Sequence, residues 1–499
     1  MLHTLDDQAL TAWNEADEQR RVRPRRIASS GRVAVGAAST NGGALAVGAT
    51  GQYIKNTDNE NTVMIPPVDA TRPPASPAEE NRVYAKVAWR LIPFLFLCYV
   101  AAYLDRVNVG FAKLQMLDDL RFSSTVYGLG AGIFFIGYVL FEVPSNIILH
   151  RVGARRWIAR IMITWGMIAG LMMFVQTPMQ FYVLRLLLGI AEAGFIPGVL
   201  LYLTYWFPPA RRGRIVALFL AAIPVSSIIG GPLSGWILEA FSGVWGLRGW
   251  QWLFVIETIP SLVLGVMVLY FLDDRVADAR WLSDAEKQLV TSRLAQESSG
   301  ADEISGLADA LRSGRVWLLG VAYFSFATSI YVTSFWLPTL IRTRGVSDPM
   351  HIGLLTALPY IVGMVAMYAV NEHADRTRER RWHAAVPCFL AGAGLMLSAL
   401  PGTHLLFGMF ALTLATAGAC SALAAFWSLP GAFLTGAAAA AGIALINSLG
   451  NIAGFVSTSV IGRMSDIFGS TAPGLYLFGA LVLVGAALVL LVPAKLVNR

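Results

Sequence analysis

Charged side chains are scarce in this chain of 499 residues. Asp, Glu, Lys and Arg together make up 14% of it, whereas about 25% is usual in soluble globular proteins. This scarcity excludes a charge-rich nucleic-acid-binding protein despite the net charge of +7. The chain instead has an excess of apolar residues, which make up 56% of it and are too many for one water-soluble core.

Cysteine and histidine are also scarce. Cys98, Cys388 and Cys420 lie in apolar stretches without a CxxC spacing, and the six histidines are scattered among span ends and loops. Such residues favour neither a disulfide scaffold nor a zinc site. We therefore expect no cofactor and no metal. Residues 1–26 are polar and charged, so we also expect no secretory signal peptide, which needs an apolar core.

Long apolar runs begin near Trp89 and recur to the end of the chain. Each is long enough for a membrane-spanning helix, which needs about 20 mostly apolar residues. The runs cover residues 90–112, 126–149, 157–176, 180–206, 214–240, 252–272, 315–341, 352–371, 383–401, 404–426, 432–461 and 472–493. The sequence therefore predicts an all-α membrane protein with twelve transmembrane helices.

Four segments follow from this pattern. Residues 1–82 are rich in Ala, Gly, Ser, Thr and Pro, which is typical of a disordered tail, here cytoplasmic. Residues 83–272 and 315–499 each hold six spans, and residues 273–314 form a cytoplasmic central loop. In that loop, Ser283 and Glu286 have the spacing of a capping box at the start of a short helix.

Two arginine-dense turns indicate an internal duplication. HRVGARR (150–156) follows the second span and ADRTRERR (374–381) follows the eighth, at matching places in the two halves. The halves therefore predict two pseudo-symmetric six-helix bundles. Short loops on the side of the two arginine turns carry more Lys and Arg than those on the opposite side. By the positive-inside rule, both termini are expected in the cytoplasm of a multi-pass inner-membrane protein.

Ionisable side chains within a span mark an ion or substrate pathway by default, because they are costly to bury. Asp105 and Arg106 lie in the first span, and adjacent residues point about 100° apart on a helix. They therefore cannot simply pair with each other. Asp105 would titrate and Arg106 would bind an anion; the alternative is an interfacial pair near the membrane surface.

Arg185 and Glu192 lie seven residues apart in the fourth span. Seven residues turn a helix by about 700° and raise it by about 10.5 Å, so both side chains share one face. They could line one pathway at different depths, or form a structural polar contact between helices. The segment SIIGGPLSG (227–235) of the fifth span favours close helix packing.

Other polar groups are weaker candidates. Asn447 and Asn451 share one face of the eleventh span, where amides serve either substrate contact or interhelical hydrogen bonding. Tyr138 and Tyr331 are candidate phenol contacts, with core packing as the alternative. Glu142, Glu239 and Glu257 rank lower, because they appear close to the ends of their spans.

Several separated motifs resemble the major facilitator superfamily, and in particular its anion:cation symporter branch. They are YLDRVNVGFAKLQM, VPSNIILHRVGARRWIARIMITWG, RLLLGIAEA, GLRGWQWLFVIE, SFWLPTLI and INSLGNIAGF. The resemblance covers about residues 84–495 and implies import of organic carboxylates with protons. His150 stands where the family's motif has an acid in the first half, so the two arginine turns are not expected to form a strictly symmetric gate.

The resemblance also implies roles for single residues. Asp105 and Glu192 are the expected proton-coupling groups, and Arg106 is a ligand of the substrate carboxylate. The other expected substrate-binding residues are Arg185, Tyr138, Asn447 and Tyr331. The expected gating loops contain Arg151, Arg155, Arg156, Asp375, Arg376 and Arg380.

The expected function is symport of a small organic anion with a proton by alternating access, in a monomer embedded in the lipid bilayer and without nucleic acid. A sugar acid such as tartrate and an aromatic acid both fit the motifs, and sodium remains an alternative to the proton. An exporter of amphiphilic or cationic compounds is the second hypothesis, which Arg106 and Arg185 disfavour. A sensor would need a larger soluble domain than residues 273–314, and the sequence contains no constellation typical of an enzyme.

Overall fold

The structure, a computed structural model, describes residues 53–54, 63–64, 76–298, 312–430 and 436–498. The chain divides into two units, residues 1–72 and 73–499. In the first unit, strands β1 (Tyr53–Ile54) and β2 (Val63–Met64) pair antiparallel. The rest of the predicted tail lies outside the described residues up to Ser76. Helix α2 already begins at Pro77, so the helical part of the chain starts before the predicted boundary at residue 82.

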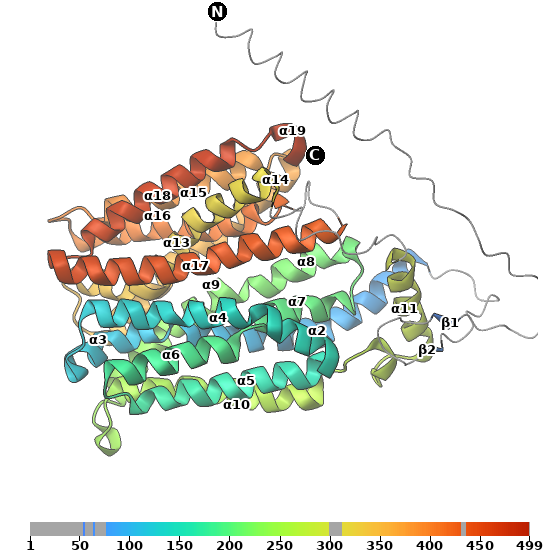
Figure 1. Cartoon of the computed structure of the whole chain (residues 1–499), viewed down its shortest axis with the longest axis horizontal. Helices are drawn as coiled ribbons and strands as arrows, with labels where there is room; N and C mark the ends of the chain where they lie inside the picture. Colours follow the sequence, from blue (N-terminus) through green and yellow to red (C-terminus); the bar gives the residue numbers. More distant parts are fainter. Residues whose placement is uncertain (1–52, 55–62, 65–75, 299–311, 431–435, 499) are drawn as a thin grey trace, which may run out of the picture. The chain divides into compact units, whose positions relative to one another are not determined.

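The second unit is helical throughout its described residues (Figure 1). Its first half contains α2 (Pro77–Val107), α3 (Val109–Leu120), α4 (Ser124–Val152), α5 (Ala154–Leu171), η1 (Met172–Phe174), α6 (Pro178–Glu192), α7 (Phe195–Thr204), α8 (Pro209–Leu220), α9 (Ala222–Ala240), η2 (Val244–Gly246), α10 (Gly249–Phe271), η3 (Val276–Asp278) and α11 (Asp284–Ser298). Its second half contains α13 (Gly314–Arg342), α14 (Pro349–Thr377), α15 (Arg381–Ser398), α16 (Leu405–Phe426), α17 (Gly436–Phe468), α18 (Ala472–Leu490) and α19 (Ala494–Val497).

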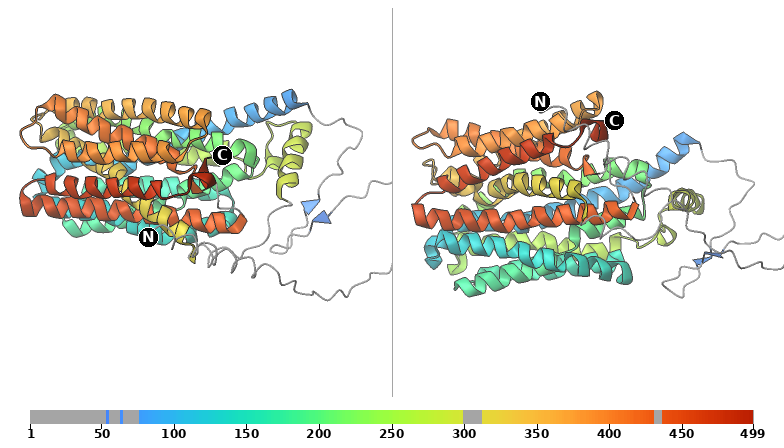
Figure 2. Two further views of the ribbon diagram at one scale, coloured as in Figure 1. Left: turned by 90° about the horizontal axis from the view of Figure 1, so that it is seen from above. Right: turned by 45° about the horizontal axis from the view of Figure 1, so that its top comes forward.

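Each of the twelve predicted apolar runs contains helix. Among the described residues, eleven helical segments are long and apolar enough to cross a membrane. The remaining run corresponds to α15, which has 18 residues and packs against α16 and α18. The fold is therefore the predicted all-α arrangement of two six-helix bundles. Figures 1 and 2 show the second half (yellow to red) beside the first half (blue to green).

Three predicted spans are each divided into two consecutive helices. Breaks at Asn108, at Ala193–Gly194 and at Ala221 separate α2 from α3, α6 from α7, and α8 from α9. Gly194 has a φ of +89°, and a Cβ there would lie 2.2 Å from the Ser145 hydroxyl oxygen. Only glycine fits this position. The break ends α6 directly after Glu192 and so places that side chain at a helix end inside the bundle.

Two helix pairs join the halves. Helix α4 packs against α17, and α9 packs against α14. Glycines allow these backbones to meet. A Cβ on Gly128 would lie 2.4 Å from the Thr458 carbonyl oxygen, and a Cβ on Gly231 would lie 2.6 Å from the Gly353 carbonyl oxygen. The close packing predicted for residues 227–235 is therefore confirmed.

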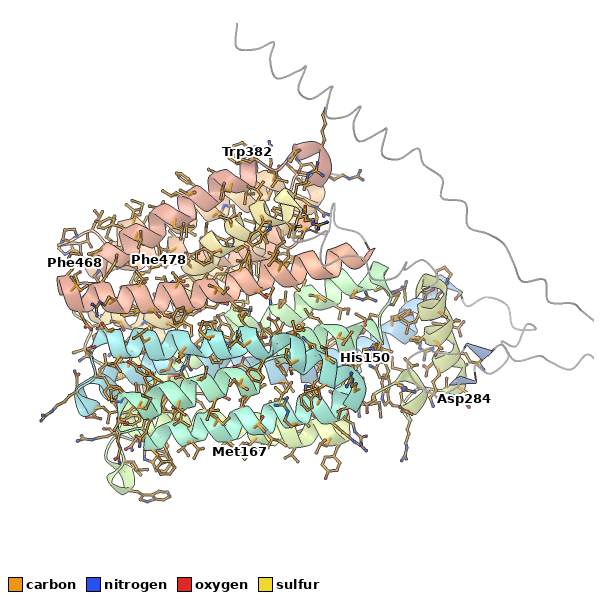
Figure 3. The ribbon with its side chains drawn as sticks, in the orientation of Figure 1. His150, Met167, Asp284, Trp382, Phe468 and Phe478 are labelled. Carbon is orange, nitrogen blue, oxygen red and sulfur yellow. The ribbon has the colours of Figure 1, made fainter. Side chains whose placement is uncertain are left out.

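These glycine contacts lie near one end of the helices, far from the arginine turns. The side chains in Figure 3 show the two ends, with Phe468 of α17 at one and His150 of α4 at the other. Further contacts reinforce the first end: the Arg342 guanidinium donates to the Leu114 carbonyl at 2.7 Å, and Tyr127 donates to the Phe335 carbonyl at 2.7 Å. The halves are thus joined at the end opposite the arginine turns.

The predicted capping box in the central loop is confirmed. The Ser283 hydroxyl oxygen accepts from the Glu286 backbone N–H at 3.3 Å, and the Glu286 carboxylate accepts from the Ser283 N–H at 2.8 Å. The helix that they begin, α11, is tied to α2, because Lys86 donates to Glu286 at 2.8 Å. The loop therefore contains a docked helix, and its residues 299–311 lie outside the described residues.

Candidate functional site

Arg106 and Glu192 form a buried ion pair between α2 and the end of α6. The Arg106 Nε–H donates to Glu192 Oε1 at 3.0 Å, and Nη2 contacts the same oxygen. Both residues are at most 5% exposed. The Arg106 guanidinium carbon also lies 5.3 Å from the ring centres of Phe134 and Tyr138. The structure thus brings together three predicted site residues, Arg106, Glu192 and Tyr138.

Asp105 points to different helices. Its Oδ2 accepts from Trp165 of α5 at 3.1 Å and from the Ser261 hydroxyl of α10. This separation of Asp105 from Arg106 agrees with the 100° offset of adjacent helical residues. Asp105 is 2% exposed, and its Oδ1 has no hydrogen-bond partner among the described residues. The carboxyl group is therefore buried in the interior of the protein.

Glu257 belongs to the same polar cluster, although its position in the sequence gave it a low rank. It is 1% exposed, and its Oε1 accepts from the Ser234 hydroxyl at 2.6 Å. Asp105 lies close enough to act on it electrostatically. The low rank was wrong because α10 extends from Gly249 to Phe271, which places Glu257 well inside the helix. By contrast, Glu239 is exposed near the end of α9.

Arg185 is buried, but it does not join the ion pair. Its Nε and Nη2 donate to the carbonyl oxygens of Gly130 and Ala131, both at 3.2 Å. Its guanidinium carbon lies 5.0 Å from the Phe134 ring centre. Among the described residues it has no hydrogen bond to Glu192. Arg185 therefore ties α6 to the backbone of α4, the helix that carries Tyr138.

The second half faces this cluster through α13 and α17. The Asn447 amide donates to Glu142 Oε1 of α4 at 2.9 Å, so the two halves meet through this hydrogen bond. The Tyr331 hydroxyl donates to Asn451 at 3.1 Å, and its ring packs edge-on against Phe135. Both predicted residues thus lie where the halves meet, and each contacts a polar or aromatic partner.

Glu142 is a second residue whose rank was too low. It is 8% exposed and lies inside α4, which continues to Val152. Its Oε2 has no hydrogen-bond partner within the described part of the chain. Unpaired buried carboxylate oxygens are costly, so this one indicates a polar site. The sequence pattern did not show this position, because α4 is apolar on nearly all sides and no polar face distinguishes Glu142. Only the length of the helix could have placed Glu142 in the interior.

The predicted gating residues lie in two separate turns. Arg151 and Arg156 are exposed, and the Arg155 backbone N–H donates to Asp274 at 2.8 Å. In the second turn, Asp375 is exposed, Arg376 pairs with Glu372 at 2.5 Å, and the Arg380 N–H donates to Asn498 at 2.9 Å. No hydrogen bond or ion pair joins the two turns among the described residues. In this state the arginine turns do not hold the halves together.

The described residues contain no group of three or more His, Cys, Asp or Glu side chains that could hold a metal ion. Cys98, Cys388 and Cys420 are buried free thiols. The chemistry of the cluster is therefore that of two cations, four carboxyl groups, amides and phenols. Such a set can bind an anion, exchange protons and transmit a change of charge between helices.

Comparisons with known proteins agree with this arrangement. A family model described as the Major Facilitator Superfamily matches residues 95–458. The chain is 51% identical over 418 residues to NicT, a candidate metabolite transport protein of Pseudomonas putida, covering 84% of this chain and 96% of the relative. It is 49% identical to a candidate tartrate transporter of Agrobacterium vitis, covering 83% of this chain and 91% of the relative.

Two further similarities bear on function and fold. A quinolone resistance transporter of Acinetobacter baumannii is 42% identical, with 84% of this chain and 96% of the relative covered. The crystal structure of a D-xylose–proton symporter superposes with a TM-score of 0.66 at 15% identity, covering 82% of this chain and 98% of that one. At this identity the structural likeness concerns the fold alone.

Proposed function

The chain belongs to the Major Facilitator Superfamily, and from this membership we propose that it imports a small organic carboxylate together with protons. As a member of a transporter family it is a multi-pass membrane transporter and not an enzyme. The proposed substrate is a sugar acid such as tartrate, or an aromatic acid. The name of the relative at 49% identity supports tartrate as the first probe.

The observation that carries the proposal is the buried Arg106–Glu192 ion pair. A substrate carboxylate needs the Arg106 guanidinium, which Glu192 occupies. Protonation of Glu192 removes its negative charge and frees the guanidinium for the substrate. One substrate carboxylate then replaces the Glu192 carboxylate beside Arg106, so the charge next to the guanidinium is unchanged. Proton uptake and anion binding are coupled by this exchange.

Asp105 is the second proposed proton site. Its carboxyl group hydrogen-bonds to Trp165 and Ser261 and lies away from Arg106, so its protonation does not compete directly with substrate. Glu257 lies within electrostatic range of Asp105 and is a further participant in this proton site. The proposed substrate pocket lies between the halves, and its shape depends on Tyr138, Arg185 and the Asn447–Glu142 hydrogen bond. The chain works as a monomer in this proposal.

Alternating access follows from the joined and separate ends of the two halves. The glycine contacts of α4 with α17 and of α9 with α14 close one end, and no hydrogen bond or ion pair within the described residues joins the two arginine turns at the other. We place both termini and the arginine turns in the cytoplasm of a bacterial inner membrane, since Lys and Arg favour the inner side. In this orientation the structure corresponds to an inward-facing state.

Export of an amphiphilic or cationic compound is the alternative function. The quinolone resistance transporter at 42% identity favours it. The buried Arg106 and Arg185 disfavour it, because a cation is repelled by them at short range.

A counterflow assay in proteoliposomes tests the proposal. Vesicles preloaded with unlabelled tartrate or benzoate are expected to take up the labelled form of the same acid. Counterflow of a fluorescent cationic dye or of a quinolone, without counterflow of either acid, would support the alternative.

A further inference from the structure

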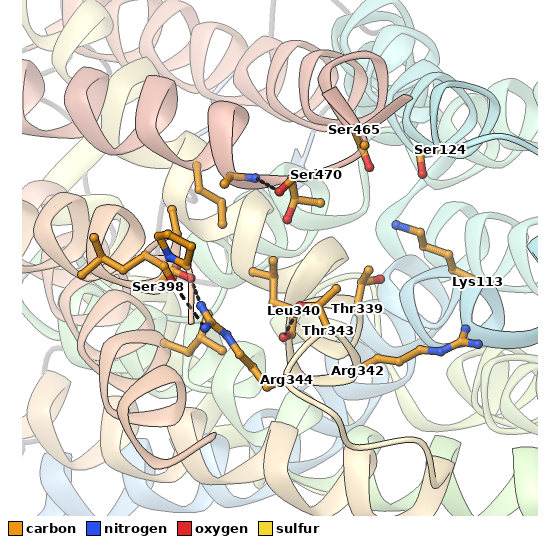
Figure 4. A pocket seen from close by; sticks show the side chains of 18 of the residues that line it. Lys113, Ser124, Thr339, Leu340, Arg342, Thr343, Arg344, Ser398, Ser465 and Ser470 are labelled. Atoms are coloured by element: carbon orange, nitrogen blue, oxygen red, sulfur yellow. Dashed lines mark hydrogen bonds between the residues drawn. The ribbon is translucent and has the colours of Figure 1, made fainter. Parts of the chain in front are cut away.

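A polar cavity lies at the joined end of the two halves, away from the arginine turns. It measures about 530 Å³, a size that suits a small-molecule ligand. Lys113, Arg342 and Arg344 contribute three cations to its lining, and Asp118 contributes the acid. Figure 4 shows the three cationic side chains together with hydroxyl groups that include those of Ser124 and Thr339.

Lys113 is the unusual residue of this cavity. It follows directly after the predicted span 90–112, but the structure buries it in α3, where it is 5% exposed. Its ammonium nitrogen has no hydrogen-bond partner among the described residues. It lies 3.4 Å from the ring centre of Trp336 and 4.4 Å from that of Tyr127. These rings stabilise a cation but leave its three donors unused.

The other charged groups near the cavity already have partners. Arg342 donates to the Leu114 carbonyl at 2.7 Å and pairs with Asp118 at 3.4 Å. Arg344 donates to the carbonyl oxygens of Leu400 and Thr403, both at 3.3 Å. The Asp466 carboxylate accepts from the Ser124 and Thr125 backbone N–H groups at 3.0 and 2.7 Å. Lys113 therefore remains as the cation without a hydrogen-bond acceptor in the described surroundings.

Thr339 adds a second unused donor. Its hydroxyl oxygen is buried without a hydrogen-bond partner in the described structure, and it lines the same cavity. In Figure 4 the Lys113 ammonium points into the space bounded by Ser124 and Thr339. Buried polar groups without partners are costly, and both unused groups here can donate. A ligand that satisfies them must be an acceptor, and the excess of cations favours an anion.

We propose that this cavity is a second carboxylate-binding site, in which the Lys113 ammonium and the Thr339 hydroxyl bind the anion. The proposal deepens the proposed function and rests on it in one respect: if the arginine turns are cytoplasmic, this site faces the outside. There it receives the substrate anion before it reaches Arg106. A cationic cavity raises the local concentration of an anion, so the site would raise the capture of dilute substrate.

Equilibrium binding of radiolabelled tartrate to the purified full-length protein in detergent tests the proposal. We expect two tartrate ions per wild-type chain and one per Lys113→Met chain, because methionine keeps the apolar stem against Trp336 but has no charge. Lys113→Arg is the matched control and is expected to bind two. Arg106→Ala removes the central site and is expected to keep one, which the double variant Arg106→Ala/Lys113→Met loses.

The outcomes separate this inference from the proposed function. One tartrate per wild-type chain with identical binding by Lys113→Met would overturn the second site and leave the central site intact. Lys113-dependent binding in Arg106→Ala would support the second site even if the wild type failed to transport tartrate. Binding of tartrate to none of the proteins would contradict both. Elution of each variant as a single species in gel filtration controls for misfolding.

Discussion

The Arg106 guanidinium and the Glu192 carboxylate pair inside the protein although 86 residues separate them in the chain. Each is buried beside a further charge that does not join the pair: Asp105 turns to α5 and α10, and Arg185 turns to the backbone of α4. The arrangement isolates one cation and one anion. Exchange of the internal anion for a substrate anion is therefore the simplest event that this cluster can perform.

The pair also makes a prediction about stability. Arg106→Met leaves the Glu192 charge buried without its partner, and removal of one member of a buried pair costs about 3–5 kcal/mol. Glu192→Gln removes that charge, so the double variant Arg106→Met/Glu192→Gln should be more stable than Arg106→Met alone. Thermal unfolding of the purified proteins in detergent measures the difference. Additive losses in the two single variants would show that the residues do not interact.

The glycine contacts predict a defect in conformational change. In Gly128→Ala, the new methyl group would lie 2.4 Å from the Thr458 carbonyl oxygen. Overpacking of this kind costs about 1–3 kcal/mol, which lowers the ratio of the joined state to the open state by about 5- to 150-fold. Tartrate uptake should fall accordingly. Tartrate binding at Arg106 should persist, because Arg106 lies in α2 and the substituted glycine lies in α4.

Gly213→Ala is the control for this substitution. Gly213 is also helical, but it is exposed and a Cβ there meets nothing within 4 Å. Uptake by this variant should match the wild type. Equal loss of uptake in both variants, or normal uptake by Gly128→Ala, would contradict the role of the α4–α17 contact.

The docking of the central-loop helix α11 should weaken at low pH. The Lys86 hydrogen bonds hold the pKa of the Glu286 carboxyl below its usual value of 4.5. A lowered folded-state pKa means that the contact stabilises the folded state above pH 4.5 and is lost as the pH falls through the lowered value. The contribution is at most about 1 kcal/mol, since both side chains are partly exposed. The amide protection factors of residues 284–295, corrected for the intrinsic exchange rate at each pH, should therefore decrease as the pH falls below 4.5.

Substitution of Lys86 should give the same loss of amide protection in α11 at pH 7. Lys86→Met removes the partner of Glu286, whereas Lys287→Met removes a neighbouring charge outside that pair. Exchange in α11 should increase in the first variant and stay unchanged in the second. An increase of equal size in both would indicate a general effect of charge instead of the Lys86–Glu286 contact.

The fold could be predicted because its main determinant is local. Apolar runs of bilayer length mark each span, and the two arginine turns mark the halves. The breaks inside spans were not predictable in the same way. The break after Glu192 depends on the positive φ of Gly194 and on Ser145 of another helix, and a single run of apolar residues contains neither fact.

The candidate residues of the site could be singled out from the sequence, but the contacts that each of them makes could not. The cost of burial singled out Asp105, Arg106, Arg185 and Glu192. Which of them pair depends on helices brought together by the fold: Arg106 of α2 pairs with Glu192, whereas Arg185 hydrogen-bonds to the backbone of α4. The burial of Glu142, Glu257 and Lys113 was not predicted for a related reason: runs of hydropathy locate span ends to within several residues only, so an interior charge can resemble a boundary charge.

The most direct test of the account is pH-gradient-driven accumulation of tartrate in proteoliposomes that contain Glu192→Gln. Glutamine permanently mimics the protonated side chain, so Arg106 can bind the substrate without proton uptake. The account predicts that accumulation is lost while tartrate exchange across the membrane continues. Accumulation by Glu192→Gln at the wild-type level would contradict proton coupling through the Arg106–Glu192 pair.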